Sequence, residues 1–193
     1  VFDDISYSKG GAVLQMLESA ITPEVFRRGI QHYLRQNAWG TATAEGLMQA
    51  LENAAGDARV KKIVESYINQ PGIPLLKMDW QCSEGKLTID IEQQRYLPVG
   101  STVSPDQEWN IPICLTLING DTSVHQCHVL DQRQQSFTHP LQECPSAIMP
   151  NQNGHGYYRF TLSKDKWRSL LDHMGTLNAG EKFSLANNLA AEY

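Results

Sequence analysis

Hydrophobic residues in the first third of the chain recur every three or four positions, the spacing of one face of an α-helix. Four such stripes, separated by polar or small residues, predict four helices. Thr22 and Pro23 form an N-cap and a first-turn proline, and Thr43 is expected to cap the third helix. Gly56 is the expected stop of that helix. The apolar positions are Ala12, Val13, Met16, Leu17 and Ala20; Val25, Phe26, Ile30, Tyr33 and Leu34; Leu47, Met48 and Leu51; and Val60, Ile63, Val64, Tyr67 and Ile68.

The period of the pattern changes after residue 75. Two prolines and a glycine in the segment 70–74 end the helical region, because none of them continues a helix well. Leu87, Ile89 and Ile91 then alternate with polar residues, as do the apolar residues of the segment 109–117. Short alternating runs between turn residues predict an antiparallel β-sandwich over residues 76–162.

A helical period returns from Ser163 onward. A first helix is predicted to bury Trp167, Leu170, Leu171 and Met174, and a second to bury Phe183, Leu185, Ala186 and Leu189. Two helices cannot bury both of their faces alone. We therefore expect residues 163–193 to be the start of a larger helical domain, and the chain to be a fragment of a longer protein.

The four cysteines, Cys82, Cys114, Cys127 and Cys144, contain no C-x-x-C pair, which argues against a structural zinc site. A hairpin turn centred on Gly120 and Asp121 would place Cys114 opposite Cys127. Two buried thiols packing as small hydrophobic residues are the favoured interpretation. A disulfide is the alternative, and it would indicate an oxidising compartment.

Composition and charge exclude some classes of function. Of 193 residues, 41% are hydrophobic, enough for a packed core, and the net charge is −5. This balance argues against a nucleic-acid partner and against a polybasic membrane patch. No apolar run is long enough for a membrane segment. Cytoplasmic and periplasmic locations both remain open.

Candidate catalytic chemistry is sparse when the residues are taken alone. The six histidines form no His-Glu-x-x-His pair, and His125 and His128, three apart in a predicted strand, should point to opposite faces. We therefore expect no metal bound by this chain. Asp3 and Asp4 are interpreted as acidic residues at a helix N-terminus, where the helix dipole favours them. Tyr7 would by itself be a half-buried aromatic residue.

Five segments together resemble the aminopeptidase N family of zinc metallopeptidases, the gluzincins. The first, FDDISYSKGGAVLQMLE, is similar to that family's Phe-Asp-x-Ile-x-Tyr-x-Lys-Gly motif and the helix after it. The others follow in the family's order and spacing over essentially the whole chain. They are GIQHYLRQNAWGTATAEGLMQALENAAG, ESYINQPGIPLL, IEQQRYL and NGHGYYRFTL, the last two resembling a Gln-x-Arg-aromatic strand and a Gly-Tyr-Tyr-Arg strand.

The resemblance implies an α+β fold in three parts. Residues 1–75 would be the C-terminal helical part of a thermolysin-like catalytic domain, residues 76–162 a β-sandwich, and residues 163–193 the first helices of a C-terminal helical domain. The implied cofactor is zinc in the parent protein, whose ligands are not in this chain. The implied partners are peptide substrates of that parent, with no nucleic acid and no membrane segment in this chain.

The resemblance also implies a role for Tyr7. In this family a glutamate activates a zinc-bound water that attacks the peptide carbonyl, and the tyrosine that Tyr7 matches donates a hydrogen bond to the resulting oxyanion. Small neighbours, Ser6, Ser8, Gly10 and Gly11, would leave space for a substrate backbone. We expect the parent to remove N-terminal residues from peptides and this fragment to be inactive alone. The alternatives are a catalytically dead relative that serves as a protein-interaction scaffold, and an unrelated binding module.

Overall fold

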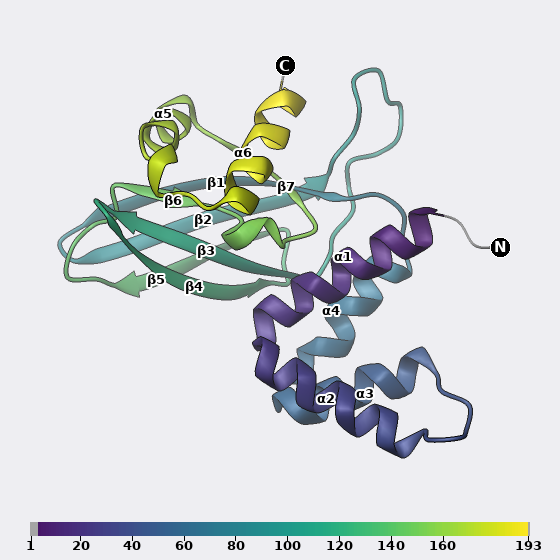
Figure 1. Ribbon diagram of the computed structural model, residues 1–193. Helices are drawn as coiled ribbons and strands as arrows, with labels where there is room; N and C mark the ends of the chain where they lie inside the picture. Colours follow the sequence, from purple (N-terminus) through teal and green to yellow (C-terminus); the bar gives the residue numbers. More distant parts are fainter. Residues whose placement is uncertain (1–3, 193) are drawn as a thin grey trace. The chain divides into compact units, whose positions relative to one another are not determined.

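The computed structural model describes residues 4–192 and divides the chain into two compact units, Val1–Pro71 and Gly72–Tyr193 (Figure 1). The first unit is helical, and the second combines two sheets with the C-terminal helices. The secondary structure is thus of the expected α+β class, while the further division at residue 163 remains a prediction. Among residues 4–192, none of the helices combines the length with the hydrophobicity that a membrane-spanning segment requires.

The helical unit has four helices, as the hydrophobic pattern predicts. The Thr43 side chain accepts a hydrogen bond from the backbone N–H of Gly46 at 3.1 Å, which confirms the predicted cap. Gly56 ends that helix in the left-handed conformation, with a φ of 64°. The helices are α1 (Asp4–Ile21), α2 (Pro23–Gln36), α3 (Ala44–Ala55) and α4 (Arg59–Ile68).

The core of the helical unit combines apolar side chains with one close helix crossing. Leu17 and Leu51 are fully buried, and a Cβ atom on Gly29 would lie 2.8 Å from Cδ2 of Leu51, so α2 and α3 touch at this glycine. Leu34 and Ile68 were predicted to face inward, but they are 62% and 51% exposed. The apolar stripe is therefore wider than the surface that the unit itself covers.

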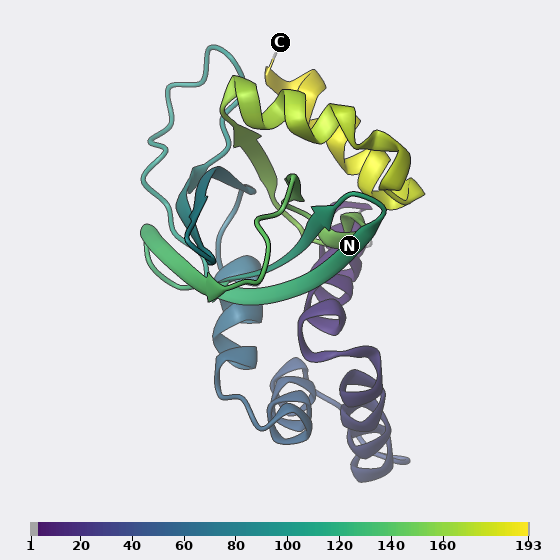
Figure 2. The same cartoon turned by 90° about the vertical axis from the view of Figure 1, so that its left-hand side faces the viewer.

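The second unit is built around two sheets (Figure 2). One sheet has the strand order β5-β2-β1-β7 and the other the order β4-β3-β6. A hairpin joins β3 and β4 through Gly120 and Asp121, and Cys114 lies opposite Cys127, both as predicted. The strands are β1 (Pro74–Ser83), β2 (Lys86–Arg95), β3 (Ile111–Asn119), β4 (Thr122–Leu130), β5 (Gln134–Pro140), β6 (Ala147–Met149) and β7 (Arg159–Leu162).

The sheets depart from the predicted sandwich in two ways. Strand β7 pairs parallel with β1, whereas the other pairings are antiparallel as expected. Strand β3 is buried from Ile111 to Ile118 on both faces, although alternation predicted one polar, exposed face. On the second face, Thr116 donates a hydrogen bond to Glu181 of the C-terminal segment, and Cys114 bonds to Cys127 of the adjacent strand β4.

The C-terminal helices α5 (Lys164–Asp172) and α6 (Ala179–Glu192) complete this unit, together with the short 3-10 turns η1 (Gln152–Gly154) and η2 (Met174–Thr176). Trp167 and Leu170 are buried, as predicted for α5, but the prediction was wrong for Leu171 and Met174, which are 38% and 39% exposed, and Met174 lies in η2. The prediction for α6 was partly wrong, because Phe183 is 71% exposed and the helix buries Glu181, Ser184 and Asn188 along with Leu185.

One buried polar residue of α6 serves a backbone group of the sheet. The Asn188 side-chain oxygen accepts a hydrogen bond of 2.7 Å from the backbone N–H of Phe160 in β7. Because β7 is the edge of its sheet, this bond satisfies a group that would otherwise lack a strand partner. Asn188 therefore joins α6 to the sheet by a hydrogen bond, in addition to the burial of Leu185.

Candidate functional site

Tyr7 lies on the exposed side of α1. Its side chain is 63% exposed, whereas Val13, Met16 and Leu17 of the same helix are at most 2% exposed and form the core. The side chain is therefore directed away from the interior of its own unit. Phe2 and Asp3 of the same motif lie outside the described residues, and Asp4 is the first residue of α1, in agreement with its interpretation as a helix N-terminal acid.

Lys9 anchors the segment that carries Tyr7. Its Nζ donates a hydrogen bond of 2.9 Å to the backbone carbonyl of Gln70, just after the end of α4. Partial burial lowers the pKa of the Lys9 ammonium. Residues two apart on a helix are rotated by about 200° around the helix axis, so they lie on nearly opposite sides. The contact of Lys9 with Gln70 therefore places Lys9 on the inner side of α1 and Tyr7 on the outer side. Lys9 was not among the predicted site residues, although the Phe-Asp-x-Ile-x-Tyr-x-Lys-Gly motif includes this lysine and could have indicated it.

The glycines that follow Tyr7 leave open space. A Cβ atom added to either Gly10 or Gly11 would meet no described atom within 4 Å. Neither glycine is required by a left-handed backbone or by a close helix contact, unlike Gly29. Glycine within a helix costs about 1 kcal/mol relative to alanine, so the two residues reduce helix stability without a packing benefit inside the described unit.

The residues that the structure describes around Tyr7 do not form a metal-binding group. Within the part of the chain that the structure describes, no three His, Cys, Asp or Glu side chains are close enough to hold a metal ion. The described residues therefore do not fit the zinc ion that the resemblance implies. His125 and His128 point to opposite faces as predicted, since His125 contacts Thr116 while His128 contacts β5.

One contact between histidines was not predicted. Nε2 of His128 lies 2.8 Å from Nε2 of His139, and the His128 ring stacks on Phe137 at 4.3 Å between centroids. Burial, with a smaller contribution from His139, lowers the pKa of His128 to about 4. The two residues belong to different sheets and are eleven positions apart, so no local pattern indicates their contact.

All four cysteines are paired in disulfides. Cys114 bonds to Cys127 across the β3–β4 hairpin, and Cys82 bonds to Cys144 over a sequence separation of 62. The interpretation of Cys114 and Cys127 as two thiols was therefore wrong. The hairpin register brings their Cα atoms to 4.1 Å, close enough for the bond to form. Disulfides are typical of oxidising compartments.

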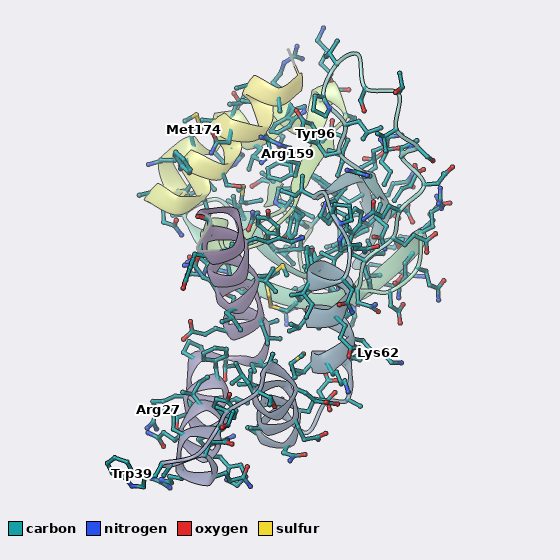
Figure 3. The ribbon with its side chains drawn as sticks, turned by 90° about the vertical axis from the view of Figure 1, so that its right-hand side faces the viewer. Arg27, Trp39, Lys62, Tyr96, Arg159 and Met174 are labelled. Atoms are coloured by element: carbon teal, nitrogen blue, oxygen red, sulfur yellow. A yellow bond between two sulfur atoms is a disulfide. The ribbon has the colours of Figure 1, made fainter. Side chains whose placement is uncertain are left out.

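Residues of the last two motifs contact partners that are distant in the chain. Gln93 is fully buried and bonds both backbone groups of Trp109, at 2.8 Å to the N–H and 2.9 Å to the carbonyl. Arg159 places its guanidinium over the ring of Tyr96, with Cζ 4.7 Å from the ring centroid (Figure 3). Residues separated by more than sixty positions thus form one contact, which neither motif predicts by itself.

Comparison with known proteins agrees with these observations. Residues 1–67 match the model of the peptidase family M1 domain. The chain is 32% identical to a glutamyl aminopeptidase of Bitis rhinoceros, which aligns over 97% of this chain and 19% of that protein. It is 29% identical to a tricorn protease-interacting factor F2 of Thermoplasma volcanium, over 99% of this chain and 22% of that protein.

A puromycin-sensitive aminopeptidase of Caenorhabditis elegans is 25% identical over 99% of this chain and 20% of that protein. The chain thus spans about a fifth of the length of these relatives. The alignments cover both units, including the sandwich that the family model does not reach. The chain therefore belongs to the aminopeptidase N family of zinc metallopeptidases, peptidase family M1.

Proposed function

We propose that this chain is part of a zinc-dependent aminopeptidase that removes N-terminal residues from peptides, and that Tyr7 stabilises the transition state of that reaction. The observation that carries the proposal is the exposed position of Tyr7 on a helix within the segment that matches the peptidase family M1 domain. The names of the relatives, which include glutamyl and puromycin-sensitive aminopeptidases, support the reaction class.

The proposed role of Tyr7 is electrostatic. When a water oxygen adds to the scissile peptide carbonyl, negative charge develops on the carbonyl oxygen. A hydrogen-bond donor aimed at that oxygen stabilises the transition state more than the ground state. A phenol is suited to this because it donates one hydrogen bond and is neutral at neutral pH. In this proposal the Tyr7 O–H donates to the developing oxyanion.

Lys9 and the adjacent glycines have supporting roles in the same proposal. Lys9 is a positioning residue: its bond to the Gln70 carbonyl fixes the first turns of α1, and with them the direction of the phenol. Gly10 and Gly11 keep the helix surface beside Tyr7 open for a substrate backbone. This accounts for two glycines that packing within the unit does not require.

The remaining parts of the site are proposed to come from other segments of the parent protein. Because the described residues hold no metal-binding set, the zinc ligands and the groups that bind the substrate α-amino group would lie outside this chain. We therefore propose that the chain by itself is inactive. Rapid hydrolysis of an aminoacyl-coumarin by the purified 193-residue chain with zinc present would contradict this part of the proposal.

The test of Tyr7 is its replacement by phenylalanine in the complete parent protein. Tyr7→Phe keeps the exposed aromatic ring and removes only its hydroxyl, so the melting temperature should change little. The maximal rate should fall by about 100- to 1000-fold, because an oxyanion donor is lost. Tyr33→Phe is the matched control: the Tyr33 hydroxyl donates to the Thr43 carbonyl at 2.9 Å, a structural bond whose loss should leave the rate unchanged. An unchanged rate in Tyr7→Phe would remove Tyr7 from the mechanism.

A further inference from the structure

We propose that the second unit contains a binding pocket for a carboxylate group, formed by Arg95, Tyr96 and Arg159. A cavity of about 290 Å³ lies where the end of β2 meets β7 and α6. It is independent of the reaction proposed for Tyr7, since all of its lining residues belong to the second unit. The residues that line it are Leu75, Gln94, Arg95, Tyr96, Leu97, Pro105, Arg159, Phe160, Thr161, Asn188 and Ala191.

The charge of the pocket is opposite to the charge of the chain. The chain has 21 acidic and 16 basic residues, yet the pocket is lined by two arginines and by no Asp or Glu. Among the described residues, no carboxylate pairs with Arg95 or Arg159. Arg27, Arg59 and Arg133, by comparison, each form an ion pair at 2.7 or 2.8 Å. The pocket is therefore a local site of positive charge without a counter-ion from these residues.

Both arginines contact neighbouring residues and keep donors available. Arg159 lies over the Tyr96 ring, and Nη1 donates to the Asn187 carbonyl at 2.9 Å. The guanidinium of Arg95 lies against the backbone of Gly72: a Cβ atom added to this glycine would be 2.7 Å from Nε of Arg95. An arginine has five N–H donors, so each side chain retains several for a ligand. Groups fixed before binding lose less entropy when a ligand arrives.

The walls of the pocket favour an organic acid over inorganic phosphate. Leu75, Leu97 and Phe160 are apolar, and they can contact an aliphatic stem while the guanidinium groups contact its charged end. The two parallel donors of a guanidinium match the two oxygens of a carboxylate. The ligand is therefore a carboxylate on an aliphatic stem, supplied either by the C-terminus of a peptide or by the side chain of an acidic residue.

The experiment is a titration of the 193-residue chain, followed by the NMR signals of the arginine Nε–H groups. The probes are acetyl-Ala-Leu as the free acid, the same peptide as its C-terminal amide, and glutarate. We expect the free acid and glutarate to cause saturable shifts of the Arg95 and Arg159 signals, and the amide to cause none. Stronger binding of the peptide acid than of glutarate would identify a peptide terminus as the ligand, and equal binding would identify an acidic side chain.

Variants show whether the two arginines carry the binding. Arg95→Gln and Arg159→Gln should each weaken the binding of the free-acid peptide by about tenfold or more, because each removes one charged partner. Arg168→Gln makes the same charge change on the exposed face of α5, outside the pocket, and should leave binding unchanged. Arg95→Lys keeps the charge, so it should bind more weakly than the wild type but more strongly than Arg95→Gln.

Two results would overturn the proposal. One is the absence of saturable binding of both acids to the folded wild-type chain. The other is equal weakening by Arg168→Gln and by the two pocket variants, which would indicate a general effect of charge. Neither result bears on Tyr7, because the titration measures binding and needs no catalytic activity.

Discussion

The two units of this chain provide hydrogen-bond partners for their buried backbone groups in different ways. The helical unit has no cysteine, and every buried polar residue in the described range belongs to the second unit. Helices satisfy their own backbone groups, so an apolar face is sufficient for packing. A sandwich with short edge strands and irregular connections needs side chains such as Gln93 and Asn188 as partners for its backbone. The first unit therefore depends mainly on the local hydrophobic pattern, and the second on pairings between distant residues.

Removal of the disulfides should cause the largest change in the stability of the second unit. By the loop-entropy estimate, loss of Cys82–Cys144, with a separation of 62, should cost about 4 kcal/mol, and loss of Cys114–Cys127, with a separation of 13, about 3 kcal/mol. Serine replacements in pairs can be compared by urea unfolding followed by tryptophan fluorescence. Trp80, Trp109 and Trp167 are buried in the second unit, whereas Trp39 is fully exposed in the first. An equal cost for the two pairs would contradict the loop-entropy explanation.

Gln93→Leu tests the buried polar network of the second unit. The change leaves the Trp109 backbone without the bonds that Gln93 makes, and unfolding should become easier by about 3 kcal/mol because buried groups lose partners. Gln49→Leu on the exposed surface of α3 is the matched control and should change stability by less than about 0.5 kcal/mol. Chemical denaturation of both variants gives the comparison. Similar small effects would show that Gln93 is not an essential partner.

Two glycine substitutions in the helical unit should act with opposite signs. Gly29→Ala places a Cβ atom 2.8 Å from Leu51 and should destabilise the unit by about 1–3 kcal/mol through overpacking. Gly11→Ala meets no described atom, so it should stabilise α1 by up to about 1 kcal/mol through helix propensity. Thermal unfolding followed by circular dichroism at 222 nm measures both. In the parent protein, a loss of activity in the stabilised Gly11→Ala variant would support a substrate path beside Tyr7.

His128 should make the stability of the second unit depend on pH. Its pKa is about 4 in the folded protein and near 6.5 when unfolded, so the unfolded state binds more protons between these values. The stability of the second unit should therefore fall as the pH drops from about 6.5 to 4, by about 1–2 kcal/mol once solvent screening is considered. Urea unfolding at pH 7 and pH 5 measures the change.

His128→Phe should reduce this pH dependence, since the replacement keeps an aromatic ring on Phe137 and does not titrate. His32→Gln changes an exposed histidine of α2 and serves as the control, with the pH dependence of the second unit unchanged. If His128→Phe retains the full loss of stability at pH 5, another group is responsible. This result would also weaken the view that long-range contacts determine the behaviour of the second unit.

Local structure could be predicted where neighbouring residues determine it. The caps at Thr43 and Gly56 and the turn at Gly120 lie where the sequence indicates, since each depends on a few adjacent residues. The alternation of Leu87, Ile89 and Ile91 likewise corresponds to buried positions in β2. The five ordered motifs, taken together, were sufficient to indicate the family.

Residue type and local spacing were sufficient to predict the order and type of most elements and the family resemblance that singled out Tyr7. The second covered face of β3, the polar inner face of α6 and the contact of His128 with His139 arise only when the chain is folded. The tertiary structure also joins Lys9 to Gln70, and Arg159 to Tyr96. The physical reason is that each of these contacts links residues far apart in the chain, and periodicity carries no information about which distant partner a side chain will meet.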